Sequence, residues 1–167
     1  LGCAWSGPSR SVRGRAGTAP VLRDGGYPNL WALLEFPETV FGGDARRSDT
    51  RPEDLTAYLE SLVVEAGPRR AREREGWSVF RRAGCLDCHA PPMFTDRRTY
   101  RAARIDAALP PELRLDTPSL RGVGARRLRL DGRDDLDSFL RAADHEWLRG
   151  GLSSTERAQL RAFLEML

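Results

Sequence analysis

Apolar residues recur at helical spacing in two separate stretches of the chain. They are Leu55, Tyr58, Leu59 and Leu62 in the first stretch, and Leu160, Phe163, Leu164 and Leu167 in the second. Steps of three and four residues place such side chains on one face of an α-helix. We therefore predict two amphipathic helices whose apolar faces, aromatic rings included, pack into a core.

Both predicted helices begin with the sequence of a capping box. Thr50 precedes Glu53 by three residues, and Ser153 precedes Glu156 in the same way. In a capping box the two side chains bond to backbone amides that a helix start leaves without partners. The pattern therefore predicts where each helix starts.

The rest of the chain predicts a few more helices and long loops. Helix-forming residues fill 70–82, and shorter helices are predicted from Thr99 to Ala108 and from Asp134 to Ala143. Between Gly84 and Ser153 there is little strand pattern, and proline and glycine pairs mark loops. The expected fold class is mainly α, and loops of this length need a bound group to pack on.

The chain also contains an internal repeat. Three short matches and one long one are separated by 105 to 108 residues. They pair Ser11-Val12-Arg13-Gly14 with Ser119-Leu120-Arg121-Gly122, Asp24-Gly25 with Asp131-Gly132, Asn29-Leu30 with Asp135-Leu136, and residues 55–62 with 160–167. We predict two related lobes, residues 1–66 and residues 67–167, each ending in the same kind of helix.

Composition and charge exclude two classes of function. All 27 basic residues are arginine and the net charge is +3, but acidic residues are interleaved throughout, so no single-sign patch for nucleic acid is expected. No apolar stretch is long enough for a transmembrane segment. Leu1-Gly2-Cys3 resembles the end of a lipoprotein cleavage box, which would lipid-anchor the protein; an unpaired, buried Cys3 is the alternative.

The most informative residues are Cys85-Leu86-Asp87-Cys88-His89. Cys-x-x-Cys-His is the attachment motif of c-type haem. A zinc site would need further ligands, for which only Cys3 and His145 remain. A thioredoxin-like dithiol would need a βαβ setting, and a disulfide would leave the adjacent histidine unexplained.

The motif thus predicts one covalent haem c, with Cys85 and Cys88 as tethers and His89 as the proximal ligand of the iron. A backbone carbonyl near Pro91 or Pro92 is expected to accept a hydrogen bond from the second ring nitrogen of the histidine. Because haem is attached to this motif outside the bacterial cytoplasm, a periplasmic location is expected.

Sequences around the motif resemble one family. The matching segments are Gly76-Trp77-Ser78-Val79-Phe80, Phe94-Thr95-Asp96, Thr117-Pro118-Ser119-Leu120-Arg121-Gly122-Val123, Asp131-Gly132-Arg133 and Ala162-Phe163-Leu164. They are similar to the C-terminal haem domain of bacterial dihaem cytochrome c peroxidases and their MauG-like relatives. The resemblance covers residues 70–167 fully, and residues 11–62 look like the latter half of a second cytochrome c domain.

The resemblance implies a two-lobed, mostly α-helical protein with cytochrome c-like helices and long loops around one c-type haem per lobe. In that family one haem reduces hydrogen peroxide and the other relays electrons. The first helix of each lobe crosses the last, which would pack Gly76 and Phe80 against Phe163 and Leu164. A glycine there would let the two backbones approach closely.

The sequence departs from the family pattern in two ways. It holds one attachment motif, and the spacing places the missing one about 23 residues before Leu1, so residues 1–66 are expected to form a partial, haemless lobe. Its end helix would need the second lobe or a partner to bury its apolar face. The family's distal methionine falls near Arg129 and Leu22, and neither residue type ligates iron.

The sixth position of the iron therefore stays undecided, with His145, Met93, Met166 or an open site as alternatives, and Arg129 as a candidate stabiliser of charge there. The expected function is periplasmic electron transfer to a redox partner protein, with an upstream haem lobe as a further candidate partner. The alternative is an oxidoreductase of the peroxidase-like type, reducing peroxide or carrying out MauG-like oxidation.

Overall fold

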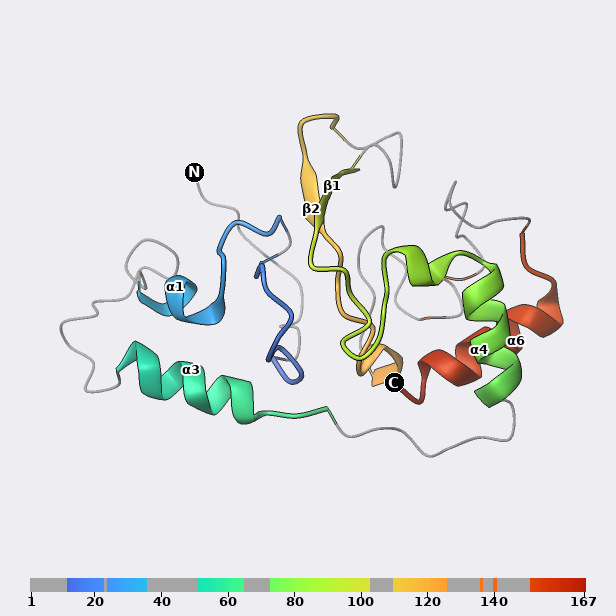
Figure 1. Cartoon of the computed structure of the whole chain (residues 1–167), viewed down its shortest axis with the longest axis horizontal. Coiled ribbons are helices and arrows are strands. Elements are labelled where there is room, and N and C mark those ends of the chain that lie inside the picture. Colours follow the sequence, from blue (N-terminus) through green and yellow to red (C-terminus); the bar gives the residue numbers. More distant parts are fainter. Residues whose placement is uncertain are drawn as a thin grey trace.

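The computed structural model describes residues 12–22, 24–35, 51–64, 73–102, 110–125, 136, 140 and 151–167. Within these ranges the elements are α1 (Leu30–Glu35), α3 (Pro52–Ser61), α4 (Glu73–Arg82), the 3-10 helix η2 (Cys85–Asp87), β1 (Thr99–Arg101), β2 (Arg114–Asp116), the 3-10 helix η4 (Val123–Ala125) and α6 (Ser154–Leu164). Figure 1 shows α1 and α3 at one end of an elongated molecule, α4 and α6 at the other, and the β1–β2 hairpin between them.

Helices α4 and α6 cross at a glycine. A Cβ atom on Gly76 would lie 2.5 Å from the Cβ of Phe163 and nearer still to the carbonyl oxygen of Gln159. Only a residue without a side chain fits there, so the backbones of the two helices can touch. The aromatic rings of Phe80 and Phe163 lie 5.3 Å apart beside the crossing. The predicted packing of Gly76 and Phe80 against α6 is confirmed.

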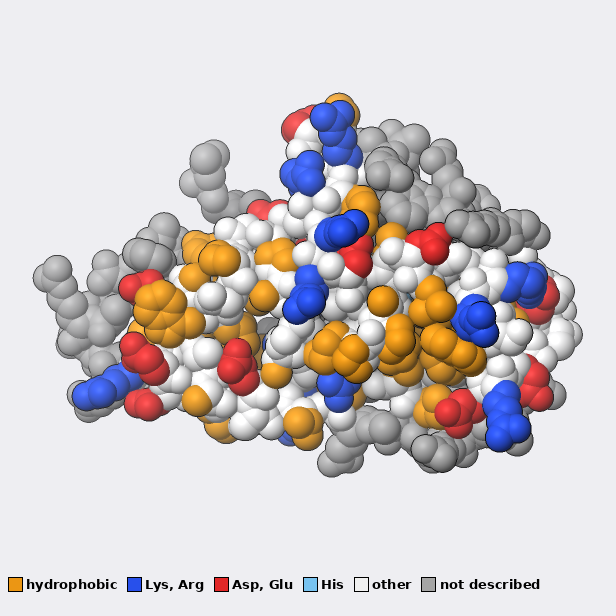
Figure 2. Space-filling view, viewed as in Figure 1, with side chains coloured by type: hydrophobic (Ala, Val, Ile, Leu, Met, Phe, Trp, Pro, Cys, Tyr) orange, Lys and Arg blue, Asp and Glu red, His pale blue; other side chains and the backbone are white. Residues whose placement is uncertain are grey.

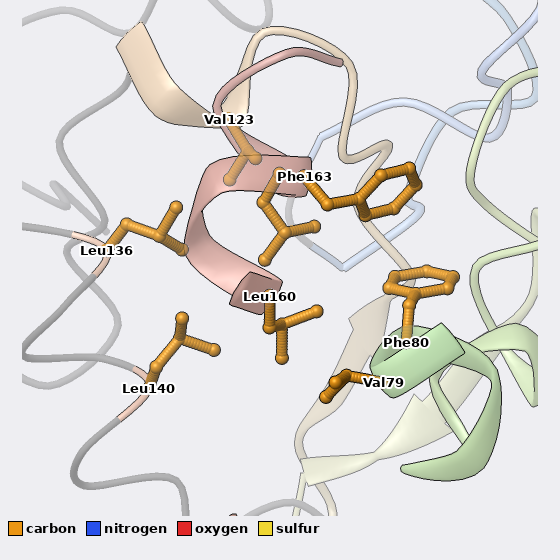
Figure 3. Packing of buried hydrophobic residues seen from close by; sticks show 8 residues of the cluster. Val79, Phe80, Val123, Leu136, Leu140, Leu160 and Phe163 are labelled. Carbon is orange, nitrogen blue, oxygen red and sulfur yellow. The ribbon is translucent and has the colours of Figure 1, made fainter. Parts of the chain in front are cut away.

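The main hydrophobic core is built around this crossing (Figure 3). Its buried members are Val79, Phe80, Val123, Leu136, Leu140, Leu160, Phe163 and Leu164. Phe80 and Leu160 are each only 1% exposed, and burial of such a side chain contributes about 1.5–3 kcal/mol. Leu136 and Leu140 are both helical, in agreement with the helix predicted over residues 134–143, whose other residues lie outside the described ranges.

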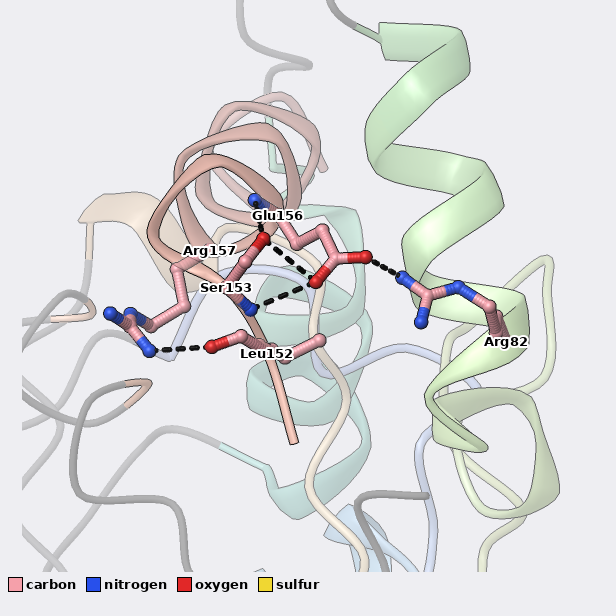
Figure 4. A network of polar contacts seen from close by, with 5 residues as sticks. All are labelled: Arg82, Leu152, Ser153, Glu156 and Arg157. Carbon is pink, nitrogen blue, oxygen red and sulfur yellow. Dashed lines mark hydrogen bonds and ion pairs between the residues drawn. The ribbon is translucent and has the colours of Figure 1, made fainter. Parts of the chain in front are cut away.

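The start of α6 has the predicted capping box (Figure 4). The backbone amide and the hydroxyl of Ser153 both donate to Oε2 of Glu156 at 2.8 Å, and the Glu156 amide donates to the Ser153 hydroxyl at 3.2 Å. These hydrogen bonds from Ser153 hold the pKa of Glu156 below its ordinary value. Arg82 of α4 also pairs with Glu156, which joins the two helices at their polar edge.

The start of α3 differs from the prediction. Its N-cap is Arg51, which makes no side-chain capping bond, and Pro52 takes the first helical position. Proline fixes the backbone in a helical φ and removes one of the amides that a helix start leaves without a partner. Thr50, the first residue of the predicted capping box, lies outside the described residues. No residue of α3 is fully buried, and Tyr58 is 60% exposed. The prediction of a core position for Tyr58 is therefore wrong.

A small antiparallel sheet replaces part of a predicted helix. Strand β1 pairs with β2 in the register Thr99 with Asp116, Tyr100 with Leu115 and Arg101 with Arg114. The helix predicted from Thr99 to Ala108 is thus wrong over 99–101, and residues 103–109 lie outside the described ranges. Leu115 is buried, whereas Arg101 and Arg114 are exposed, so the hairpin has one covered face.

Two glycines that the sequence repeat aligns have similar backbone conformations. Gly14 and Gly122 have φ angles of +70° and +67°, a left-handed conformation that glycine adopts at low cost. A Cβ on either residue would approach the side chain of Val64, at 2.5 Å and 2.9 Å respectively. Val64 thus lies between the two turns at Gly14 and Gly122. No helix in the described part of the chain is long and apolar enough to cross a membrane.

Candidate functional site

The Cys85–His89 pentapeptide forms one compact turn directly after α4. Gly84 ends that helix in the left-handed conformation, with φ of +84°, which is a common helix stop. The amides of Cys88 and His89 both donate to the carbonyl oxygen of Cys85, at 3.3 Å and 2.8 Å. Local hydrogen bonds therefore hold the two cysteines and the histidine on a single turn.

Both cysteines are half-buried thiols. Cys85 packs against the hydrophobic core, and burial raises the pKa of its thiol to about 11. At neutral pH the thiol is therefore protonated. A dithiol for disulfide exchange needs a lowered pKa and a thiolate, so this environment disfavours the thioredoxin-like alternative. Among the described residues, no three His, Cys, Asp or Glu side chains lie close enough together to hold a metal ion.

The ring of His89 is oriented by a backbone carbonyl. Its Nδ1 lies 3.0 Å from the carbonyl oxygen of Phe94, which can only accept, so Nδ1 carries the proton. The lone pair of the ring is then on Nε2, the atom that a proximal ligand offers to iron. The prediction that a backbone carbonyl accepts from this nitrogen is confirmed, but the carbonyl is that of Phe94, two residues beyond Pro92. Phe94 has φ of +52°, and this left-handed turn brings its own carbonyl to the ring.

A layer of buried hydroxyl groups holds the segment that contains Phe94. Thr95 donates to the carbonyl oxygen of Thr117 at 2.7 Å, and Ser119 donates to that of Met93 at 2.6 Å. The amide of Leu120 donates to the Phe94 carbonyl at 3.2 Å. The prediction from sequence gave these side chains no role. The sequence feature that could have indicated this role is the pair of hydroxyl residues, Thr117 and Ser119, on either side of Pro118.

Beside this layer, Tyr100 and two aspartates form a polar cluster. The Tyr100 hydroxyl donates to Oδ2 of Asp96 at 2.5 Å, and this bond raises the pKa of Tyr100 to about 12. Burial raises the pKa of Asp96, but hydrogen bonds from Tyr100, Thr117 and the Arg98 amide outweigh it, so the net shift is downward. Asp96 is thus the ionised member of the cluster.

The environment of Asp116 raises its pKa, whereas that of Asp96 lowers it. Its Oδ1 is buried without a hydrogen-bond partner. Burial, and then the nearby charge of Asp96, raises the pKa of Asp116 to about 7, against a smaller opposing effect of Arg15. An oxygen that accepts no hydrogen bond and faces a carboxylate is better tolerated as a carboxylic acid.

Asp116→Asn is expected to stabilise the protein at pH 8 more than at pH 4. The folded-state pKa lies above the unfolded value of about 3.9, so the favourable protonation of Asp116 is complete below pH 4 and is lost as pH rises through 7. Because the side chain is only partly buried, we expect a gain of about 1–2 kcal/mol at pH 8. Thermal melting at both pH values measures it, with the exposed Glu112→Gln as control. An equal effect at both pH values would contradict the assignment.

The candidates for a distal iron ligand are placed as follows. Met93 has its sulfur 3.6 Å from Nη1 of Arg121, and Met166 packs against the hydrophobic core. Leu22 is 45% exposed. His145 and Arg129 lie outside the described residues. The structure thus brings together Cys85, Cys88 and His89.

The residues of the turn fit a covalently tethered haem c in their chemistry. Two half-buried thiols lie on one turn, at the spacing that the haem-attachment motif requires. The adjacent imidazole has its Nδ1 proton directed to the Phe94 carbonyl, which leaves Nε2 as the candidate ligand atom. Trp77, Phe80 and Phe94 form one aromatic group next to the turn: Trp77 stacks on Phe80 with ring centres 5.7 Å apart, and Phe94 meets Phe80 edge-to-face at 6.1 Å.

Comparison with known proteins adds one result. No family model matches the chain, and no curated protein matches it. A solved structure of hydrazine synthase from Kuenenia stuttgartiensis, pressurised with xenon, matches with a TM-score of 0.67 and 20% sequence identity. The match covers 93% of this chain and 70% of that chain. It supports a cytochrome c-like fold, and not the dihaem peroxidase family specifically.

Proposed function

We propose, from this shared fold, that the chain is a c-type cytochrome module that transfers electrons through one covalent haem. The observation that carries the proposal is the turn itself, in which Cys85, Cys88 and His89 are adjacent and the His89 tautomer is fixed by Phe94. When bound, the haem supplies the one-electron redox chemistry, and the protein supplies tethering, ligation and surroundings.

Each residue of the turn then has a defined task. Cys85 and Cys88 tether the group, and His89 offers Nε2 to the iron. The Phe94 carbonyl, by accepting from Nδ1, raises the basicity of the ring and keeps it from rotating. The aromatic group of Trp77, Phe80 and Phe94 lowers the local dielectric constant, which helps to set the reduction potential.

The proposal extends to location, organisation and partner. Because haem is attached to this motif outside the bacterial cytoplasm, the proposed location is the periplasm. In the proposed organisation, residues 67–167 are the haem-binding domain and residues 1–66 are a partial lobe without haem. Figure 2 shows basic side chains along the β1–β2 hairpin, where Arg97, Arg98, Arg101 and Arg114 are exposed. Arginine matches carboxylates in geometry, so the hairpin suits an acidic surface on a small redox protein.

Expression of the chain together with haem-attachment machinery tests the proposal. We expect haem to stay with the denatured protein after acid extraction. Cys85→Ala with Cys88→Ala is expected to lose all of it, and Ser78→Ala, an exposed position on α4, none. Haem that is extracted from the unaltered protein, or that stays in the double variant, would overturn the proposal.

Carbon monoxide added to the ferrous protein separates electron transfer from the peroxidase-type alternative. A spectrum that does not change on addition indicates a strong sixth ligand and a carrier. An immediate change indicates an open sixth position, as an enzyme acting on a small ligand would need.

A further inference from the structure

We infer that Ser119 is a positioning residue for His89, and thereby tunes the reduction potential of the haem. The inference rests on the proposed function, because it requires His89 to ligate iron. The Phe94 carbonyl reaches the ring of His89 only while Phe94 keeps a strained backbone conformation.

Phe94 has a conformation that bulky residues avoid. Its φ of +52° lies in the left-handed region, which costs on the order of 1–3 kcal/mol for a residue other than glycine. Such a conformation persists only where the surroundings fix it. The carbonyl that His89 needs therefore depends on contacts made by neighbouring peptide groups.

Those contacts come from one segment, residues 117–120. Ser119 Oγ donates to the Met93 carbonyl at 2.6 Å and holds the peptide group before Phe94. The Leu120 amide donates to the Phe94 carbonyl at 3.2 Å and holds the peptide group after it. The same oxygen accepts from His89 Nδ1 at 3.0 Å, so it serves two donors.

Ser119 is suited to this task by burial and by its second hydrogen bond. It is 3% exposed, and its Oγ also accepts from the Arg121 amide at 3.2 Å. Since the hydroxyl both donates and accepts, it is held from two sides. Thr95 makes a parallel connection one residue beyond Phe94, donating to the Thr117 carbonyl at 2.7 Å. Removing the Ser119 hydroxyl frees the Met93 peptide, and Phe94 can then relax toward negative φ.

Relaxation of Phe94 would weaken the hydrogen bond at Nδ1 of His89. A weaker acceptor makes the imidazole less basic, so it stabilises ferric iron less. Ser119→Ala is therefore expected to raise the reduction potential. At a fixed applied potential we expect the ratio of ferric to ferrous protein to fall by at least about threefold. Residues that hydrogen-bond directly to a metal ligand typically change binding or activity by about 10–100-fold. The effect of Ser119 should be smaller, because Ser119 acts on His89 only through the Phe94 peptide.

The test is spectroelectrochemical titration of the haem-loaded chain with three variants. Ser119→Ala removes the hydroxyl, Ser119→Thr keeps it while adding a methyl group, and Ser78→Ala removes a hydroxyl at an exposed site. We expect the potential to rise in Ser119→Ala alone. The threonine variant should keep the original potential even where its thermal stability falls. A potential that followed stability across the three variants would overturn the inference.

A second readout does not use the haem. In the full chain without haem, the nitrogen-15 shifts of His89 report its tautomer, and the chain has only two histidines to assign. We expect Nδ1 to be protonated in the unaltered chain and a mixture of tautomers in Ser119→Ala. If haem attaches normally while potential and tautomer both stay unchanged, the inference fails and the proposed function stands. If no haem attaches to the unaltered chain, the proposed function fails first.

Discussion

Gly76→Ala is expected to lower the free energy of unfolding by about 2–4 kcal/mol, one of the two largest effects in this protein. The new Cβ would lie 2.5 Å from the Cβ of Phe163 and nearer still to the Gln159 carbonyl. Backbone atoms of α6 cannot rotate away as a side chain can, so the helices must separate. Alanine gains about 1 kcal/mol of helix propensity over glycine, which offsets part of the cost. Denaturant unfolding measures the net loss.

Gly151→Ala is the matched control. Gly151 has φ of +66° and nothing within 4 Å of the position of a Cβ. The same substitution there costs only the left-handed strain, about 1–2 kcal/mol. A loss at Gly76 no larger than that at Gly151 would show that α4 and α6 can shift apart freely, and that their close crossing does not define the core.

At the proposed haem site, His89→Gly is expected to remove the ligand of the iron while leaving the two cysteine tethers. Covalent haem should still form through Cys85 and Cys88, but the fraction with the spectrum of imidazole-ligated haem should fall at least about tenfold. Added imidazole should restore that spectrum, because the glycine leaves room for it. Optical spectra of the ferric and ferrous protein, with and without imidazole, measure both changes.

His145→Gly serves as the comparison, since these are the two histidines of the chain. An unchanged spectrum in His145→Gly assigns ligation to His89 alone. A change in both variants would make His145 the sixth ligand, one of the alternatives left open from the sequence. A change in His145→Gly only would contradict the assignment of His89.

The features predicted correctly from the sequence are mostly those decided by neighbouring residues. The capping box of Ser153 and Glu156 forms as expected, because its hydrogen bonds join residues three apart. The crossing at Gly76 came from the resemblance to a family, and it holds here because any side chain would meet Gln159. The compact turn at Cys85 needs only its own backbone.

The failures involve partners that are distant in sequence. Residues 99–101 have helix-compatible sequence, but their pairing with Arg114–Asp116 decides their conformation. The acceptor for His89 was placed too early because the turn at Phe94 is fixed by residues 117–120. Tyr58 follows the apolar period of α3 yet is exposed, because a periodic pattern states which side chains share a face and not what covers it.

The turn of Cys85, Cys88 and His89 and the orientation of the His89 ring depend on partners at different sequence distances, so they can form at different stages of folding. The cysteines and the histidine are presented by a turn whose hydrogen bonds span at most four residues. The Phe94 carbonyl is fixed only once Ser119, 26 residues beyond Met93, has arrived. During folding, the turn that would receive the proposed haem can therefore form before the ring of His89 has its final orientation. Tethering and tuning would then be successive steps, and the second would be complete only in the folded protein.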